Sequence, residues 1–336
     1  MSKESSITGQ IVKEYLEVEK GKRPKDRLSK LALARLIYKK NSEAFSGVEH
    51  VRTCIRYYTG QLGGKQREEA GSREFWDMKR EIPEALVEEW TPFVIPKVYK
   101  NALILSDIHV PYHDRDALFA AVHYGVENGV DCVILNGDVM DFYQLSRFDK
   151  DPRRRGFEEE VRLGREFIAW MRKMFKCPIY YKLGNHEERY EAYLRKKAPE
   201  LLEVPEWQMS VLLKCGENQI EVIDNKRIIK FGKLNILHGH EFQSGFASPV
   251  NPARSFLMKT NANVLCGHVH RTSTHREKKI HDKAIQGWTT GCLCELEPEY
   301  ARINKYNLGF ARVERLEEDS VRVHNLLIDD GEVLYA

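Results

Sequence analysis

The chain of 336 residues has a net charge of only +3, with 42% hydrophobic and 31% charged residues. This length and balance exclude a chain too polar to fold, and they predict one large core with a small accessory domain. No apolar run approaches the roughly 20 residues that a membrane span needs, and the N-terminal residues lack the apolar core of a signal peptide. We therefore expect a cytoplasmic protein without membrane contact.

The seven cysteines do not indicate a disulfide scaffold in a chain of this length. Cys132, Cys177 and Cys266 lie in or beside apolar runs, where cysteine behaves as a small buried hydrophobe, and no CxxC pair occurs. The pair Cys292 and Cys294 in GCLCE is too isolated to predict a zinc site.

Charge is distributed unevenly along the chain. Met1 to Arg67 holds 15 Lys and Arg against 7 Asp and Glu, a net charge of +8, whereas the remainder holds 38 against 43, a net charge of −5. The basic segment is rich in helix-forming residues, and SGVEHVRTCIRYYTG opens with an apparent capping box of Ser46 and Glu49. We predict three short helices, which form a small all-α domain over residues 1–67.

The third predicted helix presents Arg52 and Arg56 one turn apart. This arrangement fits a helix-turn-helix module that contacts nucleic acid, but it also fits a helical cap with a solvated basic face. The stretch GGKQREEAGS, residues 63–72, is polar and glycine-rich, and two Trp and three Pro follow it. This composition predicts a linker over residues 68–97. The main domain is predicted to span residues 98–336.

Apolar, strand-like runs in the main domain repeatedly end in polar side chains. Five runs end in this way, and the residues at their ends are Asp107 and His109, Asp138, Asn185 and His186, His238, and His268 and His270. Helix-like segments separate several of the runs, which predicts an α/β fold. Because the carboxyl ends of strands in such sheets face a common crevice, we expect the five polar clusters to converge.

The converging groups are carboxylates, one amide and several imidazoles. This mixed oxygen and nitrogen set suits manganese, iron or zinc better than magnesium or calcium. There are more donors than one ion requires, and pairs of cations roughly 3.5–4 Å apart recur in enzymes that cleave phosphate esters. Any single cluster could consist of polar residues that only form hydrogen bonds at the start of a loop. Such a structural role is a poor explanation for five clusters in one domain.

The ordered motifs D-x-H, G-D-x-x-D, G-N-H-E, H-G-H and G-H-x-H resemble those of the calcineurin-like metallophosphoesterase superfamily. The resemblance covers about Lys97 to Asp330, and the stretch after the last motif is similar to phage and bacterial members. It implies layered β-sheets flanked by helices and two divalent metal ions, with manganese as the expected metal and iron or zinc as alternatives.

The resemblance also implies a role for each motif residue. One metal would be held by Asp107, His109 and His270, the other by Asn185, His238 and His268, with Asp138 as the bridge. Metal-activated hydroxide would then attack the phosphorus in line. His186 would remain free to donate a proton to the leaving oxygen. Asp141 and Glu187 fit positions outside the ligand set from which they would orient imidazoles, but either could instead stabilise a helix N-terminus.

The substrate is less strongly indicated by the sequence. Ser/Thr protein phosphatases of the superfamily follow the second aspartate of G-D-x-x-D with Arg-Gly, whereas Phe142 and Tyr143 follow Asp141 here, which disfavours a phosphoprotein. The basic segments instead favour the phosphodiester bonds of nucleic acid or nucleotides, although PRRR also fits a solvated turn. The candidate nucleic-acid contacts are Arg52, Arg56, Arg153, Arg154, Arg155 and Arg254.

Two further functions remain open from the sequence. One is a phosphomonoesterase that acts on a small metabolite or nucleotide, and the other is a nucleic-acid-binding protein with a structural metal centre. The five complete clusters together with His186 favour an enzyme over the second of these. The sequence leaves the oligomeric state open.

Overall fold

A computed structural model of the chain divides into two compact units, Met1–Glu88 and Glu89–Ala336. The structure describes residues 6–61, 82–83, 90–147, 156–224, 226–242, 250–278, 280 and 284–335. Within these residues, no helix combines the length and the apolar character needed to cross a membrane.

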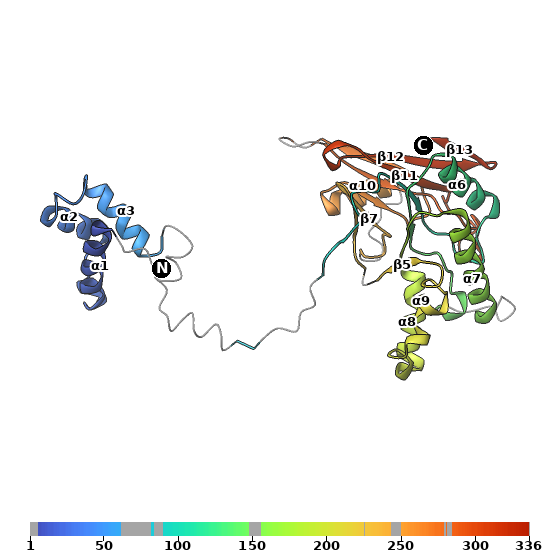
Figure 1. Ribbon diagram of the computed structural model, residues 1–336, viewed down its shortest axis with the longest axis horizontal. Coiled ribbons are helices and arrows are strands. Elements are labelled where there is room, and N and C mark those ends of the chain that lie inside the picture. The colour runs from blue at the N-terminus through green and yellow to red at the C-terminus, as the bar shows by residue number, and fades with distance from the viewer. Residues whose placement is uncertain are drawn as a thin grey trace. The chain divides into compact units, whose positions relative to one another are not determined.

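Among its described residues, the first unit contains three α-helices: α1 (Ile7–Lys20), α2 (Lys30–Lys40) and α3 (Val48–Tyr58) (Figure 1). Ser6 caps α1 and Ser29 caps α2 through side-chain oxygens that accept backbone N–H bonds. The helices share a small core made of Val12, Leu33, Ala34, Ile37, Phe45, Val51 and Ile55. The three predicted helices are therefore present and pack around one apolar centre.

The predicted capping box at the third helix is wrong. The N-cap of α3 is Gly47, which has no side chain to accept a hydrogen bond, and the Ser46 hydroxyl instead contacts Nδ1 of His50 at 3.2 Å. Arg56 is exposed on this helix, and Arg52 forms an ion pair with Glu49. Both arginines therefore belong to the accessible surface of the first unit.

Two β-sheets form the second unit. The larger sheet has the strand order β13 (Glu332–Tyr335), β12 (Val321–Asp329), β11 (Gly309–Arg315), β2 (Asn101–Leu105), β3 (Cys132–Asn136), β4 (Ile179–Lys182) and β5 (Ile220–Ile223). The other sheet has the order β1 (Phe93–Val94), β6 (Ile229–Phe231), β7 (Leu234–Leu237), β8 (Val264–Cys266), β10 (Ile285–Thr289) and β9 (Ser273–Glu277). Strands β2 to β5 are mutually parallel, and β7 is parallel to β8.

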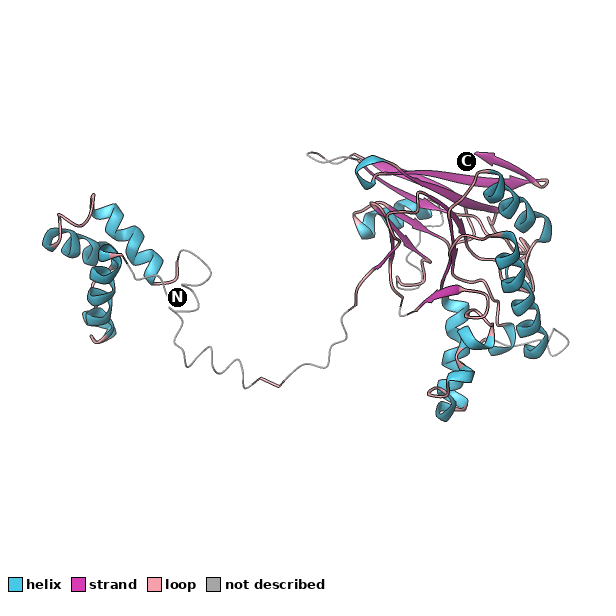
Figure 2. Cartoon of the chain, viewed as in Figure 1, coloured by secondary structure: helices cyan, strands magenta, loops and turns pink. Residues whose placement is uncertain are grey.

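Helices cover the outer face of each sheet, as Figure 2 shows. The principal ones are α6 (Arg115–Glu127), α7 (Phe157–Met174), α8 (Asn185–Lys197) and α10 (Pro252–Thr260). Alternate residues of β2 enter different cores: Leu103 packs in the core beneath α6 and α7, whereas Ile104 packs in the core between the sheets. Burial on both faces explains why these strands read as continuous apolar runs. The fold is the predicted α/β architecture of layered sheets flanked by helices.

The second unit begins before residue 98, where the sequence placed the start of the main domain. Phe93 and Val94 pair in parallel with Ile229 and Lys230 of β6, and the next residue, Ile95, is fully buried. These contacts bring the end of the predicted linker, 68–97, into the sheet. Most of that linker lies outside the described residues.

Candidate metal centre

The polar clusters lie in loops at the carboxyl ends of strands from both sheets. Strands β2, β3 and β4 are parallel neighbours, so the loops that follow them lie at the same edge of the larger sheet. The loops that follow the parallel strands β7 and β8 likewise lie at one edge of the other sheet. Close contacts join the two groups of loops. The predicted site residues brought together are Asp107, His109, Asp138, Asp141, His186, His238, His268 and His270.

Five of these residues adopt the left-handed backbone conformation, which side chains other than glycine rarely tolerate. The φ angles are 57° at Asp107, 53° at His109, 50° at Asp138, 68° at His268 and 53° at His270. Each such residue costs of the order of 1 kcal/mol and persists only where surrounding contacts enforce it. This concentration of strain marks the loops as a functional site.

Two motif glycines allow the loops to approach each other closely. Gly137 has a φ of +86°, and a Cβ at this position would lie 2.5 Å from Nδ1 of His238. A Cβ at Gly267 would lie 2.6 Å from Oδ2 of Asp107. Any side chain at either position would displace a predicted metal ligand.

Two predicted ligand histidines are oriented by hydrogen bonds to groups that are not themselves predicted metal ligands. Nδ1 of His109 lies 3.0 Å from Oδ1 of Asp141, and Nδ1 of His238 lies 2.8 Å from the backbone oxygen of Asn136. When Nδ1 of each histidine donates a hydrogen bond to one of these oxygens, its Nε2 is left with a lone pair that points toward the predicted metal ligands. Nε2 of His238 then lies 3.3 Å from Oδ2 of Asp138.

His270 is held differently, because its outer nitrogen faces sulfur. Nδ1 of His270 lies 3.9 Å from Sγ of Cys294, while its Nε2 lies 3.3 Å from Oδ1 of Asp107. The sequence analysis gave Cys294 no role at a metal site. Cys294 and His270 are 24 positions apart in the sequence. The isolated GCLCE motif does not reveal that the loops carrying these two residues lie in contact.

The arrangement of donor atoms fits divalent cations. Three groups, each with ligand atoms within 4.8 Å of one another, occur among the described residues: His109 with Asp138 and His186, Asp138 with His238 and His268, and His109 with His270 and Cys294. Two ring nitrogens, Nε2 of His109 and Nε2 of His270, lie only 3.2 Å apart. Oδ1 of Asn185 and Nε2 of His238 are buried without a hydrogen-bond partner. A cation would satisfy these converging lone pairs.

The buried charges of the centre stabilise one another. Burial opposes ionisation of Asp138, but His238 and His186 hold its pKa well below the ordinary value. Burial likewise favours neutral His238, yet Asp138 raises the pKa of this imidazole to about 10. A metal that binds His238 therefore displaces a proton from it.

Glu187 holds the Asp138 loop against the start of α8. Its Oε2 accepts hydrogen bonds from the backbone N–H groups of Asp138 at 3.0 Å and Gly184 at 2.7 Å. Its Oε1 accepts from the backbone N–H of Met140 and from the Tyr181 hydroxyl. Each of these four contacts is to a backbone amide or a phenol, so Glu187 supports the helix N-terminus and the loop, as the second alternative predicted.

An arginine that the sequence analysis did not single out lies beside His186. Nη2 of Arg189 lies 2.7 Å from Nε2 of His186, and Nη1 donates to the backbone oxygen of Asp141 at 2.9 Å. Positions three apart on a helix share a face, so the spacing within α8 could have identified this residue. The arginine adds a cation to a centre otherwise rich in carboxylates.

The predicted nucleic-acid contacts lie apart from these loops in the sequence. Arg254 is an exposed residue of α10, and Arg52 and Arg56 belong to the first unit. The stretch 153–155, which contains Arg153, Arg154 and Arg155, lies outside the described residues.

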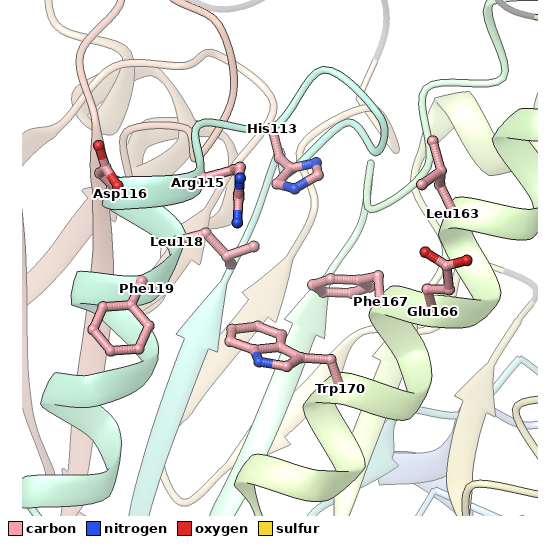
Figure 3. Close-up of a pocket in the computed structure, with 9 residues that line it drawn as sticks. All are labelled: His113, Arg115, Asp116, Leu118, Phe119, Leu163, Glu166, Phe167 and Trp170. Carbon is pink, nitrogen blue, oxygen red and sulfur yellow. The ribbon is translucent and has the colours of Figure 1, made fainter.

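A cavity of about 640 Å³ lies between α6 and α7 (Figure 3). Its lining residues are His113, Arg115, Asp116, Leu118, Phe119, Leu163, Glu166, Phe167 and Trp170. Phe119 on α6 and Trp170 on α7 line its two sides. The cavity contains none of the predicted metal ligands and is therefore distinct from the candidate metal centre.

Comparisons with known proteins agree with this geometry. A family model described as calcineurin-like phosphoesterase matches residues 101–272, which include all of the predicted metal ligands. The Gene 54 proteins of Mycobacterium phages L5 and D29 are 28% and 27% identical over 179 residues, which cover 51% of this chain and 69% of each relative.

Solved structures with low identity also align with this chain. The phosphoesterase Yfce from E. coli aligns at 13% identity and a TM-score of 0.35, over 70% of this chain and 96% of that chain. A dimetal phosphatase from Danio rerio aligns at 11% identity and a TM-score of 0.37, over 68% of this chain and 96% of that chain.

Proposed function

The chain belongs to the calcineurin-like phosphoesterase family and is therefore a metal-dependent phosphoric ester hydrolase, and from this premise we propose that it cleaves phosphodiester bonds in nucleic acid or nucleotides. The observation that carries the two-cation centre on which this proposal depends is the shared position of Asp138. Its Oδ2 lies 3.3 Å from Nε2 of His238, 3.8 Å from Nε2 of His186 and 3.9 Å from Nε2 of His109. One carboxylate thus faces donors from several loops, as a bridge between two cations must.

We propose that Asp107, His109 and His270 hold one divalent cation, that Asn185, His238 and His268 hold the other, and that Asp138 serves both. When bound, the cations supply charge neutralisation of the phosphate and a lowered pKa for water. The mixed nitrogen and oxygen donors support manganese, with iron or zinc as alternatives. Asp141 and the Asn136 carbonyl keep the outer nitrogens of two histidines engaged and the inner nitrogens directed at the centre.

His186 is proposed as the proton donor to the leaving oxygen. Its Nδ1 lies 2.8 Å from the backbone oxygen of Asp141, so Nε2, which Nη2 of Arg189 contacts at 2.7 Å, is the nitrogen that would serve a substrate once the guanidinium moves aside. Its backbone N–H donates to Oδ1 of Asp138 at 2.9 Å, so the imidazole is fixed relative to the proposed bridge. A positioned acid of this kind commonly contributes about 10²–10⁴-fold to the rate.

Charge supports a nucleic acid or nucleotide substrate. The first 67 residues carry a net charge of +8, and Arg56 and Arg254 are exposed. Basic surfaces bind nucleic-acid phosphates and release their counterions, so affinity should fall steeply with salt. We propose that the first unit binds nucleic acid and that the second unit cleaves it.

Hydrolysis of two small esters tests the proposal. With manganese added, we expect bis-(p-nitrophenyl) phosphate, a diester, to be turned over with a higher kcat/KM than p-nitrophenyl phosphate, a monoester. Single-stranded and duplex nucleic acids should then be cleaved under the same conditions. A preference for the monoester together with inert nucleic acids would instead indicate a phosphomonoesterase.

A further inference from the structure

Arg189 touches the atom of His186 that the proposed function uses. The residue lies one turn after His186 on α8, and its Nη2 is 2.7 Å from Nε2 of the imidazole. Because Nδ1 of His186 faces the Asp141 carbonyl and donates to it, Nε2 accepts the hydrogen bond from the guanidinium. The guanidinium therefore occupies the position that a leaving oxygen must reach.

A purely structural role would not require this contact. Nη1 of Arg189 already joins α8 to the Asp141 loop by donating to the Asp141 carbonyl at 2.9 Å. Nη2 makes a second, separate hydrogen bond, to the imidazole of His186. Arg189 is partly exposed, whereas His186 is only 9% exposed. Arg189 is therefore the more accessible residue of the pair.

A phosphate bound beside His186 would place negative charge next to the carboxylates of the centre. Asp107 and Asp138 are buried carboxylates of the cluster, and Asp141 lies 3.1 Å from Nδ1 of His186. A phosphate adds further negative charge on the same side as His186. A guanidinium offers five donors in a planar fork that matches the oxygens of a phosphate, and two of its nitrogens already point into this region.

We propose that Arg189 is a substrate-binding residue that donates to a non-bridging oxygen of the scissile phosphate. The inference rests on the proposed function, in which His186 protonates the leaving oxygen. On substrate binding, Nη2 exchanges its hydrogen bond with the imidazole for one with the phosphate, which frees Nε2 of His186 to take up from solvent the proton that it then donates to the leaving oxygen. Nη1 keeps its bond to the Asp141 carbonyl, so the guanidinium stays anchored.

Binding of inorganic phosphate to the full-length, manganese-loaded protein tests the inference by calorimetry, without any need for turnover. Arg189→Met should raise the dissociation constant for phosphate about 10- to 100-fold, the range expected for a lost charge-assisted hydrogen bond. Arg189→Lys should fall between that variant and the wild type. Arg195→Met is the matched control, because Arg195 lies on the same helix and pairs with Glu191 at the exposed surface.

Metal content is measured in every variant, because the inference requires that Arg189→Met keep its manganese. Unchanged phosphate affinity in a metal-replete Arg189→Met protein would overturn the inference, as would a wild type that binds no phosphate. A loss confined to substrates with poor leaving groups, with phosphate affinity intact, would make Arg189 a positioning residue for His186 and would also overturn it. If the wild type hydrolyses no ester but still binds phosphate through Arg189, the proposed function fails while this inference stands.

Discussion

Lys182 and Glu241 form a buried ion pair, with 2.8 Å between Nζ of the lysine and Oε1 of the glutamate. Lys182 ends β4 and precedes the Asn185 loop, whereas Glu241 follows His238. Oε1 of Glu241 also accepts the backbone N–H of His238 at 3.1 Å. The pair thus connects two ligand-bearing loops that arise from different sheets.

Removal of one partner should destabilise the second unit strongly. Lys182→Met leaves the Glu241 carboxylate buried without its cation, and such a change typically costs about 3–5 kcal/mol. We expect a loss in this range in the free energy of unfolding, measured by denaturant titration, together with reduced metal content. Lys226→Met, which removes a half-exposed pair with Glu188, should change stability by less than about 1 kcal/mol. Equal effects of both variants would contradict a special role for the buried pair.

His186→Ala should keep both metals but lower kcat by about 10²–10⁴-fold, because it removes the proposed proton donor. The loss should shrink for diesters with good leaving groups, which need little protonation. Steady-state kinetics over a series of substituted phenyl esters, with metal analysis of each sample, provides the measurement. Loss of metal from the variant would show that His186 is a ligand.

Arg52 and Arg56 should contribute to nucleic-acid binding if α3 faces the ligand. The double substitution to Ala should weaken binding and lower the slope of log K against log salt by about 2, because each phosphate contact releases roughly one counterion. Fluorescence anisotropy at several salt concentrations measures both effects. Lys39→Ala with Lys40→Ala removes the same charge from exposed positions at the end of α2 and serves as the control. Identical slopes for the two double variants would show that α3 is not the contact surface.

Glu160 should make stability fall as pH rises. Burial, aided by the nearby Asp141 charge, raises the pKa of this α7 carboxyl from 4.5 to about 8. The folded state therefore retains a proton that the unfolded state releases above pH 4.5, so the stabilisation is complete below that value and is lost as pH approaches 8.

Glu160→Gln provides the test, because its side chain is neutral at every pH. The stability of the wild type relative to this variant should fall by up to about 1.4 kcal/mol per pH unit between pH 5 and 8. Denaturant unfolding in the presence of a chelator measures the difference without a contribution from bound metal. A difference that stays constant with pH would refute the raised pKa.

The buried strands and the convergence of the polar residues at their ends were predictable from the sequence, because both follow from short local patterns of apolar and polar residues. Apolar runs such as that of β2 are buried on both faces, and the polar residues at their ends do converge, because parallel neighbours end at one edge. The metal roles of these residues stay predictions.

Other features depend on contacts that a single sequence does not reveal. Cys294 reaches His270, and Lys182 reaches Glu241, only because separate loops and sheets pack together. The N-cap of α3 was mispredicted because serine is a common N-cap residue, so Ser46 was preferred to its neighbour Gly47, which is the N-cap in the structure. Arg189 could have been found from its spacing to His186, but a charged residue on a helix usually faces solvent.

Asp138→Asn isolates the charge of the proposed bridge, because an amide of nearly the same shape removes only the negative charge that two cations must share. Manganese bound per chain and diester turnover are measured together in the wild type and the variant. We expect about two manganese ions and active hydrolysis in the wild type, against lower metal content and no detectable turnover in Asp138→Asn. A variant that keeps two ions and near-normal turnover would contradict the dinuclear assignment.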